Sequence, residues 1–360
     1  MTARPESTQP SIAATTETVL PPPRRAERAR RFNPRDFVYR YGLLVVLAAL
    51  IAFFAATQPA FGTVQNGLII LQSVAIVTIV ALGVTVSLAA DGFDLSVGAN
   101  VGFVVMLTTM AMVRLALSGP TALLIGLGAG AVIGLINGVL IVKARIPDLL
   151  ATLGAMFVWD GLALIMTSGQ SVAPGMSIDS NGTPAPGVIT GDFLWLGRGN
   201  LFGVPIPVVV MVLIAAAVIV FLDRTRWGRM VYAIGGNQEA ARLAGIRVER
   251  VRIGAYVISA MLASVGGILL AARLGRGDVG AGDPYLLESV AAALIGFAVL
   301  GTNRPNAIGT FVGAVFVGVL LNGLTMMNFP YYTQDFVQGA LLVAALIMSF
   351  SSLFRTGRTR

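Results

Sequence analysis

The sequence predicts an all-α polytopic membrane protein with about ten transmembrane helices and both termini in the cytoplasm. Three observations predict this fold class. The 360 residues are 56% hydrophobic and only 12% charged, with a mean hydropathy of +0.82, a composition that water-soluble globular domains do not have. Apolar segments of about 17 to 25 residues recur along the chain, each long enough to cross ~30 Å of hydrocarbon. The basic residues gather on alternate connections between these segments.

The first segment follows a polar N-terminus. Residues 1–39 are rich in Pro, Thr, Ser and Arg and have no apolar period, so we expect a mostly disordered cytoplasmic tail. The basic run Arg24 to Arg40 and the apolar stretch after it resemble a signal peptide. Because further spans follow at once, we interpret this stretch as an uncleaved first span of a membrane domain over 40–353, before a short cytoplasmic tail at 354–360. The expected spans are residues 41–58, 66–90, 97–117, 121–142, 148–167, 203–222, 253–273, 286–301, 307–327 and 334–353.

The charges predict the orientation. All but four of the 25 Lys and Arg residues lie in the two tails or in the connections near 143, 223–252 and 304. By the positive-inside rule these parts are cytoplasmic, so the basic charge indicates a lipid bilayer and not a nucleic-acid partner. The connection 168–202 is long, rich in Gly, Ser and Pro, and external on this topology. The four exceptions are Arg114, Arg198, Arg273 and Arg276.

Small residues in the fourth span predict close helix packing. Gly126, Gly130, Gly134 and Gly138 repeat every four residues and line one side of that helix, where another helix can approach.

A weak internal sequence repeat indicates an inverted structural repeat with a transport path at its interface. Asn137-Gly138 is followed 16 residues later by glycine, and so is Asn322-Gly323. On our topology the helices that carry the two pairs, the fourth and the ninth, run in opposite directions.

The residue inventory excludes most enzyme chemistry. The chain has no Cys and no His, and therefore lacks thiolates, the commonest general base and the commonest transition-metal ligand. The one lysine, Lys143, precedes Ala144, whereas a phosphate-binding GxxxxGK[ST] loop needs Ser or Thr there. We expect a protein that is not an enzyme, with no metal or cofactor of its own. If ATP drives it, another subunit binds the ATP.

The segment Asp223 to Arg252 is an unusually long and basic cytoplasmic connection, and its centre predicts a short docking helix. Gly235 and Gly236 break the chain, and Asn237 can cap the residues that follow. Glu239 lies where the helix dipole favours an anion, and Gly245 can end the helix. About seven residues, roughly 10 Å, would then be helical. The alternative is an ordinary solvated loop with a helical turn.

Two carboxylates interrupt the apolar stretch 66–117. The octet DGFDLSVG runs from Asp91 to Gly98 and includes Asp94 and Ser96. Two interpretations remain open: a plain cytoplasmic turn in which Asp94 caps the next helix, or a broken helix beside a transport path, where carboxylates meet water or polar partners.

This octet resembles the Gly-Gly-Ile-Asp-Leu-Ser-Val-Gly signature of the ribose and simple-sugar family of ABC importer permeases. NGVLIVKARIPDLLATLGAMFVWDGLALIMT, which begins at Asn137, and VYAIGGNQEAARLAGI, which begins at Val231, are similar to two further stretches of that family. The three matches occur in order and the likeness covers about 41–353. The resemblance implies a dimeric pore built from two copies or from a paralogue. It also implies a periplasmic sugar-binding protein and a cytoplasmic ATPase subunit that holds ATP and Mg.

The resemblance also implies roles for the predicted docking helix and for the external connection. Asn237 to Ile246 would be the coupling helix that sits in a groove of the ATPase, and 168–202 would either dock the binding protein or form a disordered or surface-packed loop. Within the coupling helix, polar contacts are expected from Glu239 and Arg242 and packing from Ala240, Ala241 and Leu243. The whole expected coupling set is Asn237, Gln238, Glu239, Ala240, Ala241, Arg242, Leu243 and Gly245.

Two departures from the family pattern stand out. The stretch Gly296 to Pro305 has Phe297 and Ala298 where the family has a small residue and a hydroxyl, although Arg304 is kept. Asp160 stands where the family more often has a basic residue. We expect Asp160 to pair with an arginine, to bond sugar hydroxyls beside the apolar face of Trp159, or to be exposed near the outer surface. The residues expected at the path or helix break are Asp91, Asp94, Ser96, Asn137, Trp159, Asp160 and Asn322.

The sequence thus predicts the membrane subunit of an ATP-driven importer of a monosaccharide or polyol in a bacterial inner membrane. An ion-coupled secondary transporter that uses Asp91, Asp94 or Asp160 is the alternative.

Overall fold

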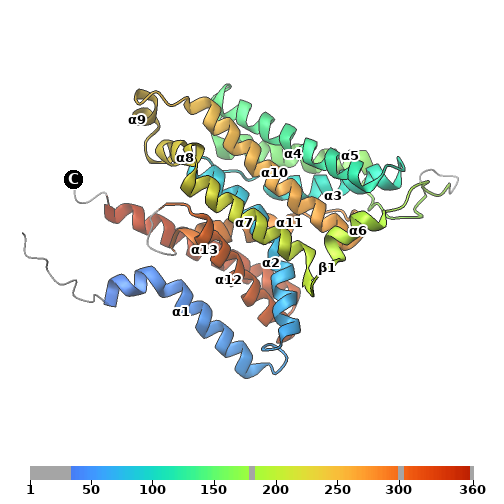
Figure 1. Ribbon diagram of the computed structural model, residues 1–360, viewed down its shortest axis with the longest axis horizontal. Coiled ribbons are helices and arrows are strands. Elements are labelled where there is room, and N and C mark those ends of the chain that lie inside the picture. Colours follow the sequence, from blue (N-terminus) through green and yellow to red (C-terminus); the bar gives the residue numbers. More distant parts are fainter. Residues whose placement is uncertain (1–33, 178–182, 299–303, 357–360) are drawn as a thin grey trace, which may run out of the picture.

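The structure is a computed structural model that describes residues 34–177, 183–298 and 304–356. It is a bundle of long helices with one short hairpin (Figure 1). The elements are α1 Pro34–Thr57, α2 Val64–Ala89, α3 Val97–Val113, α4 Gly119–Val142, α5 Asp148–Thr167, α6 Gly191–Arg198, β1 Asn200–Leu201, β2 Val204–Pro205, α7 Ile206–Arg224, α8 Arg226–Gly236, α9 Gln238–Leu243, α10 Val248–Leu274, α11 Asp283–Ala298, α12 Ala307–Met326 and α13 Tyr331–Thr356.

Each of the ten predicted apolar segments is mostly helical over its described residues, which confirms a mostly helical polytopic membrane protein. Within the described chain, 6 helices are long and apolar enough to cross a membrane, and α3 and residues 41–57 of α1 are shorter apolar helices. The count of ten crossings therefore stays a prediction. Several boundaries differ from those predicted. Residues 34–39 belong to α1 and residues 354–356 belong to α13, whereas α3 ends at Val113, before the end of the predicted span 97–117. The connection 168–202 contains α6 and β1, and β2 lies at the start of the predicted span 203–222, so the fold is not purely helical. Residues 1–33 and 357–360 of the two tails lie outside the described chain.

The long helices alternate in direction between two faces of the bundle. One face, here the α8–α9 face, carries the end of α4 and the start of α10, which an ion pair joins through Lys143 and Glu249. It also carries the start of α12, since the Tyr232 hydroxyl of α8 donates to the Pro305 carbonyl at 2.9 Å. α4 and α12 therefore run in opposite directions, as the inverted repeat requires. The opposite face, the α6 face, carries the hairpin, and α1 begins and α13 ends on the α8–α9 side (Figure 1).

α2 is the central helix, and it packs against α7, α10, α11 and α12. Nearly every residue from Val74 to Ala89 is buried, including polar ones. The Thr85 and Thr310 hydroxyls lie 2.6 Å apart and join α2 to α12. In a lipid bilayer the hydrophobic effect does not drive helices together, because lipid tails are as apolar as the side chains. Polar pairs such as this one and close packing therefore hold the bundle together.

The predicted glycine face of α4 is confirmed, and its partner is α10. A Cβ atom added to Gly134 would lie 2.5 Å from the Val257 Cα and 2.6 Å from the Tyr256 carbonyl oxygen, and one added to Gly138 would lie 3.0 Å from the Ile253 Cα. Helix backbones that approach this closely leave no room for any side chain.

We therefore expect Gly134→Ala to destabilise the bundle by about 1–3 kcal/mol, the usual cost of overpacking, because α4 and α10 must separate. Gly128→Ala is the matched control, since a Cβ atom there has nothing within 4 Å. Thermal unfolding in detergent measures the difference. Equal melting temperatures for the two variants would contradict the close α4–α10 approach.

Candidate functional site

The break between α2 and α3 encloses a buried carboxylate. The chain leaves α2 through Asp91, whose φ is 56°, and the Gly92 amide donates to the Ser87 carbonyl at 2.9 Å. Asp94 is fully buried and accepts three hydrogen bonds. Its Oδ1 accepts from the Ser96 amide at 3.0 Å and from the Ser96 hydroxyl at 2.7 Å, and its Oδ2 accepts from the Ser259 hydroxyl of α10 at 2.9 Å. The octet is thus a helix break that is folded into the interior.

The capping interpretation of Asp94 needs correction. The residue before the first turn of α3 is Ser96. The one backbone amide that donates to Asp94 in the described chain is that of Ser96, which lies before the helix and not inside it. The carboxylate is also inside the protein, unlike that of a plain cytoplasmic turn. Burial raises the pKa of Asp94 even though its serine partners act in the other direction. The charged form therefore depends on those donors.

The network extends from Asp94 into α4 and along α10. The Asn137 side-chain nitrogen donates to the Ser96 hydroxyl at 2.8 Å, while the Asn137 Oδ1 atom is buried without a partner in the described chain. Farther along α10, Asn100 of α3 donates to the Ala260 carbonyl at 2.8 Å and accepts from the Ser264 hydroxyl at 3.0 Å. Three of the predicted residues, Asp94, Ser96 and Asn137, therefore meet in one cluster with Ser259, which sequence reasoning missed.

The predicted docking helix is present as α9. Asn237 caps it by accepting from the Ala240 amide at 3.0 Å, Glu239 lies in its first turn, and Gly245 follows it with a φ of 82°. It has 6 residues instead of about seven. Gly235 and Gly236 do not form a loop, because they end an amphipathic helix, α8, that the analysis of the sequence missed. The described segment thus consists mainly of helices, and the docking role of α9 stays a prediction.

The exposed side of α9 differs from the one expected. Leu243 is 88% exposed, and Glu239, Ala240 and Arg242 are exposed too. Ala241 is 4% exposed and belongs to the internal cluster of α2, α7, α8 and α10. Ala241 therefore supports α9 from inside and is not available to a partner.

α9 contacts the helix break directly. The Gln238 side chain donates to the Asp91 carboxylate at 2.7 Å, and Arg252 of α10 donates to the Asp91 carbonyl at 3.2 Å. Asp91 is exposed, so of the two predicted carboxylates one faces the surface at α9 and the other faces the interior. The two sites that the sequence suggested separately are adjacent.

Trp159 and Asp160 lie on α5, away from this network. The Trp159 ring packs on Phe103 of α3 with centroids 5.3 Å apart, and its ring nitrogen is buried without a partner in the described chain. Asp160 is half-buried and forms no salt bridge with any described arginine. The structure therefore offers Asp160 no arginine partner.

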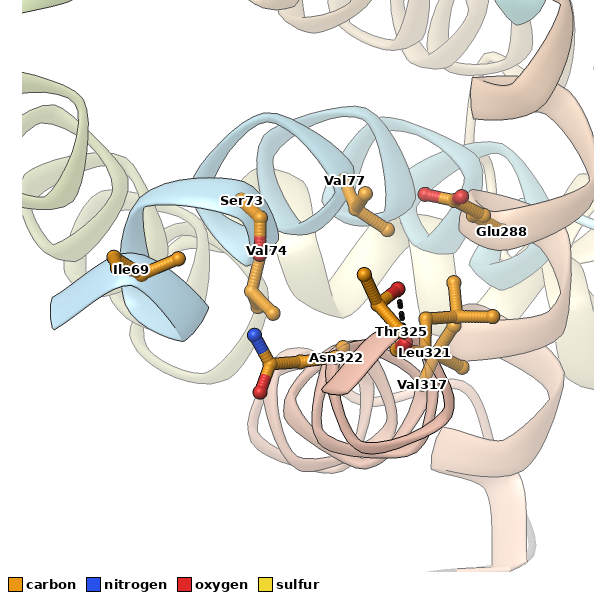
Figure 2. Close-up of a pocket in the computed structure, with 10 residues that line it drawn as sticks. Ile69, Ser73, Val74, Val77, Glu288, Val317, Leu321, Asn322 and Thr325 are labelled. Atoms are coloured by element: carbon orange, nitrogen blue, oxygen red, sulfur yellow. Dashed lines mark hydrogen bonds between the residues drawn. The ribbon is translucent and has the colours of Figure 1, made fainter. Parts of the chain in front are cut away.

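Asn322 lies in a third place, at a cavity between α2, α11 and α12 that has a volume of about 200 Å³. Its side-chain oxygen accepts from Asn66 at 3.2 Å. Figure 2 shows the Glu288 carboxylate facing the same space from α11. Sequence reasoning missed Glu288, although it is the one carboxylate in the predicted span 286–301 and could have been found on that ground.

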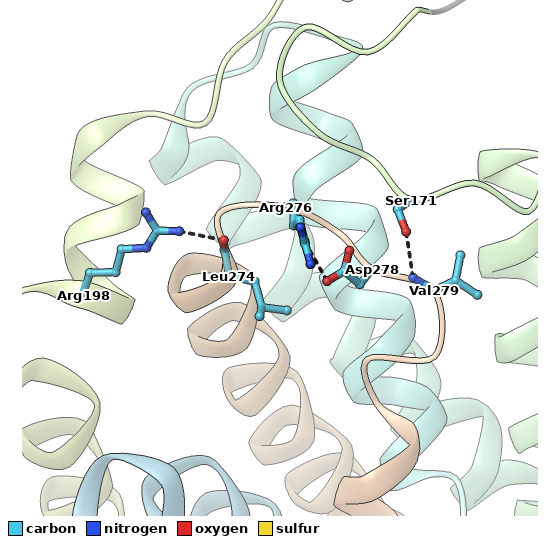
Figure 3. Close-up of polar contacts among 6 residues, drawn as sticks. All are labelled: Ser171, Arg198, Leu274, Arg276, Asp278 and Val279. Atoms are coloured by element: carbon cyan, nitrogen blue, oxygen red, sulfur yellow. Dashed lines mark hydrogen bonds and ion pairs between the residues drawn. The ribbon is translucent and has the colours of Figure 1, made fainter. Parts of the chain in front are cut away.

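The connection 168–202 is packed against the bundle. Val172 and Gly277 exchange two backbone hydrogen bonds, and Arg198 of α6 donates to the Arg273 and Leu274 carbonyls at the end of α10, at 2.8 Å and 2.6 Å. Figure 3 shows this arrangement, with Asp278 and Arg276 paired nearby. Of the structural alternatives, surface packing holds for the described residues and disorder does not. Docking of a partner here stays a prediction.

The stretch Gly296 to Pro305, which differs from the family pattern, is described only in part, since 299–303 lie outside the described chain. The retained Arg304 lies 4.3 Å from the centre of the Tyr232 ring and 3.8 Å from the Asp223 carboxylate. It thus ties the start of α12 to α7 and α8 on the α8–α9 face. Phe297 packs against the main core.

Comparison with known proteins assigns the family. The protein-family model described as "Branched-chain amino acid transport system / permease component" matches residues 66–346. The ribose import permease protein RbsC of Escherichia coli (strain K12) is 32% identical over 319 residues, which is 89% of this chain and 96% of the relative. The chain is a sugar ABC permease. RbsC of Bacillus subtilis (strain 168) is 33% identical over 89% of this chain and 95% of its own, and the xylose transport system permease protein XylH of E. coli (strain K12) is 30% identical over 87% and 93%. No solved structure matches this chain.

Family membership confirms the resemblance drawn from the three motifs. The description of the matched family model refers to amino acids, whereas these near full-length relatives are named for sugars. The chain is therefore assigned to the sugar permeases of the family. The permease is therefore a multi-pass membrane protein of a sugar importer, and no enzyme family is indicated.

The Asp94 network yields a stability prediction. Asp94→Ala leaves the Ser96 and Ser259 hydroxyls without their acceptor, and we expect a loss of about 1–3 kcal/mol in the free energy of unfolding. Asp335→Ala removes an exposed carboxylate and serves as the control. Thermal unfolding of both variants in detergent checks this. A melting temperature of Asp94→Ala that matches the control would mean that the network contributes nothing to stability.

Proposed function

We propose that this permease imports a monosaccharide or a related polyol into the cytoplasm of a bacterium across its inner membrane. A separate ATPase subunit, which binds ATP and Mg, drives it, and an external binding protein delivers the sugar. The single observation that carries the proposal is the near full-length similarity to ribose and xylose permeases. On this proposal the α8–α9 face is cytoplasmic and the α6 face is external, in agreement with the positive-inside rule.

The coupling surface is the exposed side of α9, with Glu239, Ala240, Arg242 and Leu243 as its contact residues. A leucine that is 88% exposed on a basic face is costly in water and suits a groove in a partner protein. Asn237 and Gly245 set the two ends of the helix, and Ala241 holds it to the bundle.

Motion of α9 would reach the transport path through Asp91. ATP binding to the partner favours one conformation of the permease and nucleotide release the other, which is alternating access by differential affinity. The bond from Gln238 to Asp91 passes a shift of α9 to the break that holds Asp94, and from there to α4 and α10. A second permease copy, or a paralogue, would complete the pore.

Ion-coupled secondary transport is the competing function. Uptake by purified components in liposomes separates the two. Dependence on added ATPase and binding protein is expected, and gradient-driven uptake by this chain alone would overturn the proposal.

Leu243→Asp is expected to weaken binding of the ATPase subunit about tenfold or more, because it places a charge in the proposed groove. Phe202→Asp on the α6 face is the matched control, since Phe202 is 98% exposed. Co-purification with the ATPase and thermal unfolding are measured together. Unchanged ATPase binding by Leu243→Asp would remove α9 as the contact.

Asp91→Ala and Gln238→Ala should each lower the sugar transported per ATP hydrolysed, and the double variant should be no worse than either single one, because the two residues act as one link. Asp335→Ala, which removes an exposed carboxylate on α13, is the control. Additive losses would show that Asp91 and Gln238 act independently.

A further inference from the structure

A pair of adjoining cavities lies between the helices in the half of the bundle nearest the α6 face. The first is the space of about 200 Å³ between α2, α11 and α12. The second, of about 360 Å³, lies between α2, the end of α10 and the start of α11. Ser73 and Glu288 line both, so the two spaces adjoin at these side chains. The second cavity lies at the low end of the ~300–1,000 Å³ typical of small-ligand sites.

The polar groups at this junction have hydrogen-bonding capacity left over. The Glu288 Oε1 atom accepts from Gln338 of α13 at 3.2 Å, and the other carboxylate oxygen has no partner in the described chain. The Ser73 hydroxyl donates to the Ile70 carbonyl at 2.8 Å and can still accept. The Asn322 side chain accepts from Asn66, but its nitrogen donates to no described residue. One wall therefore offers both acceptors and a donor.

A carboxylate inside a membrane protein is costly and generally has a functional reason. Glu288 lies about one and a half turns after the start of α11, and apolar Val77 and Val317 line the same cavity. It has one amide partner and faces open space (Figure 2). That arrangement is unlike Asp94, which three donors enclose fully.

We infer that Ser73, Glu288 and Asn322 form a binding site for the hydroxyl groups of an uncharged sugar, at the external entrance of the path. Sugar hydroxyls donate and accept, so they can use the free Glu288 oxygen, the Ser73 lone pairs and the Asn322 amide together. Entry runs through the second cavity, whose lining includes Arg273 and Asp278. Asp278 lies close to the packed connection of the α6 face (Figure 3). The inference rests on the proposed function and assigns its substrate site.

The test uses the complete transporter, with ATPase and binding protein, in liposomes. Labelled ribose and xylose are the probes, and the concentration of loaded binding protein is varied. Glu288→Gln keeps the shape of the side chain and its contact with Gln338 but removes the strongest acceptor. We expect about a tenfold or greater loss of uptake, the size of effect that follows when a charged hydrogen-bond partner is lost. Thermal unfolding of the purified variant, compared with the wild type, shows whether it is folded. Asp335→Asn, an exposed carboxylate on α13, is the matched control.

Ser73→Ala and Asn322→Ala give a second reading if Glu288→Gln does not fold. Each should reduce uptake several-fold, with a change in the ratio of the ribose and xylose rates, which a merely structural effect would not alter. Wild-type rates and an unchanged sugar ratio in the folded variants would overturn the site while leaving sugar import intact. Failure of the wild-type transporter to take up either sugar, despite ATPase activity that the binding protein stimulates, would instead count against the proposed function.

Discussion

The buried Asp94 carboxylate is the constraint on which the rest of the structure depends. A carboxyl group out of contact with solvent must be satisfied by hydrogen bonds, and its donors come from the α2–α3 break and from α10. Ser96 then passes the connection on to Asn137 of α4. Since an unpartnered charge in the interior would cost several kcal/mol, these helices have one favourable arrangement.

Close backbone packing is a second interaction that holds the same helices together. The glycine face of α4 brings its backbone against α10, and the pair is clamped at the α8–α9 face by Lys143 and Glu249. A unit that consists of α3, α4 and α10 results, held by small residues and polar side chains, as expected in lipid. Asp91, at the edge of this unit, accepts a hydrogen bond from Gln238, so a side-chain contact ties α9 to the unit.

The opposite half of the bundle is built differently. Glu288 of α11 and Asn322 of α12 have unused hydrogen-bonding capacity and border cavities, whereas both oxygens of Asp94 accept hydrogen bonds. The bundle therefore has one half whose helices are joined by buried polar contacts and one half with unused hydrogen-bonding capacity beside cavities.

The sequence by itself determined the positions of the apolar helices, the capped helix at Gln238–Leu243, the glycine face of α4 and the family, because periodicity, capping and motifs are local properties. Only the tertiary structure decided which polar residues meet. Asp94 and Ser259 are 165 residues apart, and Ser73, Glu288 and Asn322 come from three different helices. It also turned Ala241 inward and placed Asp160 out of ion-pair distance of every described arginine, because the face that a residue presents to its neighbours depends on the packing of helices distant in the chain.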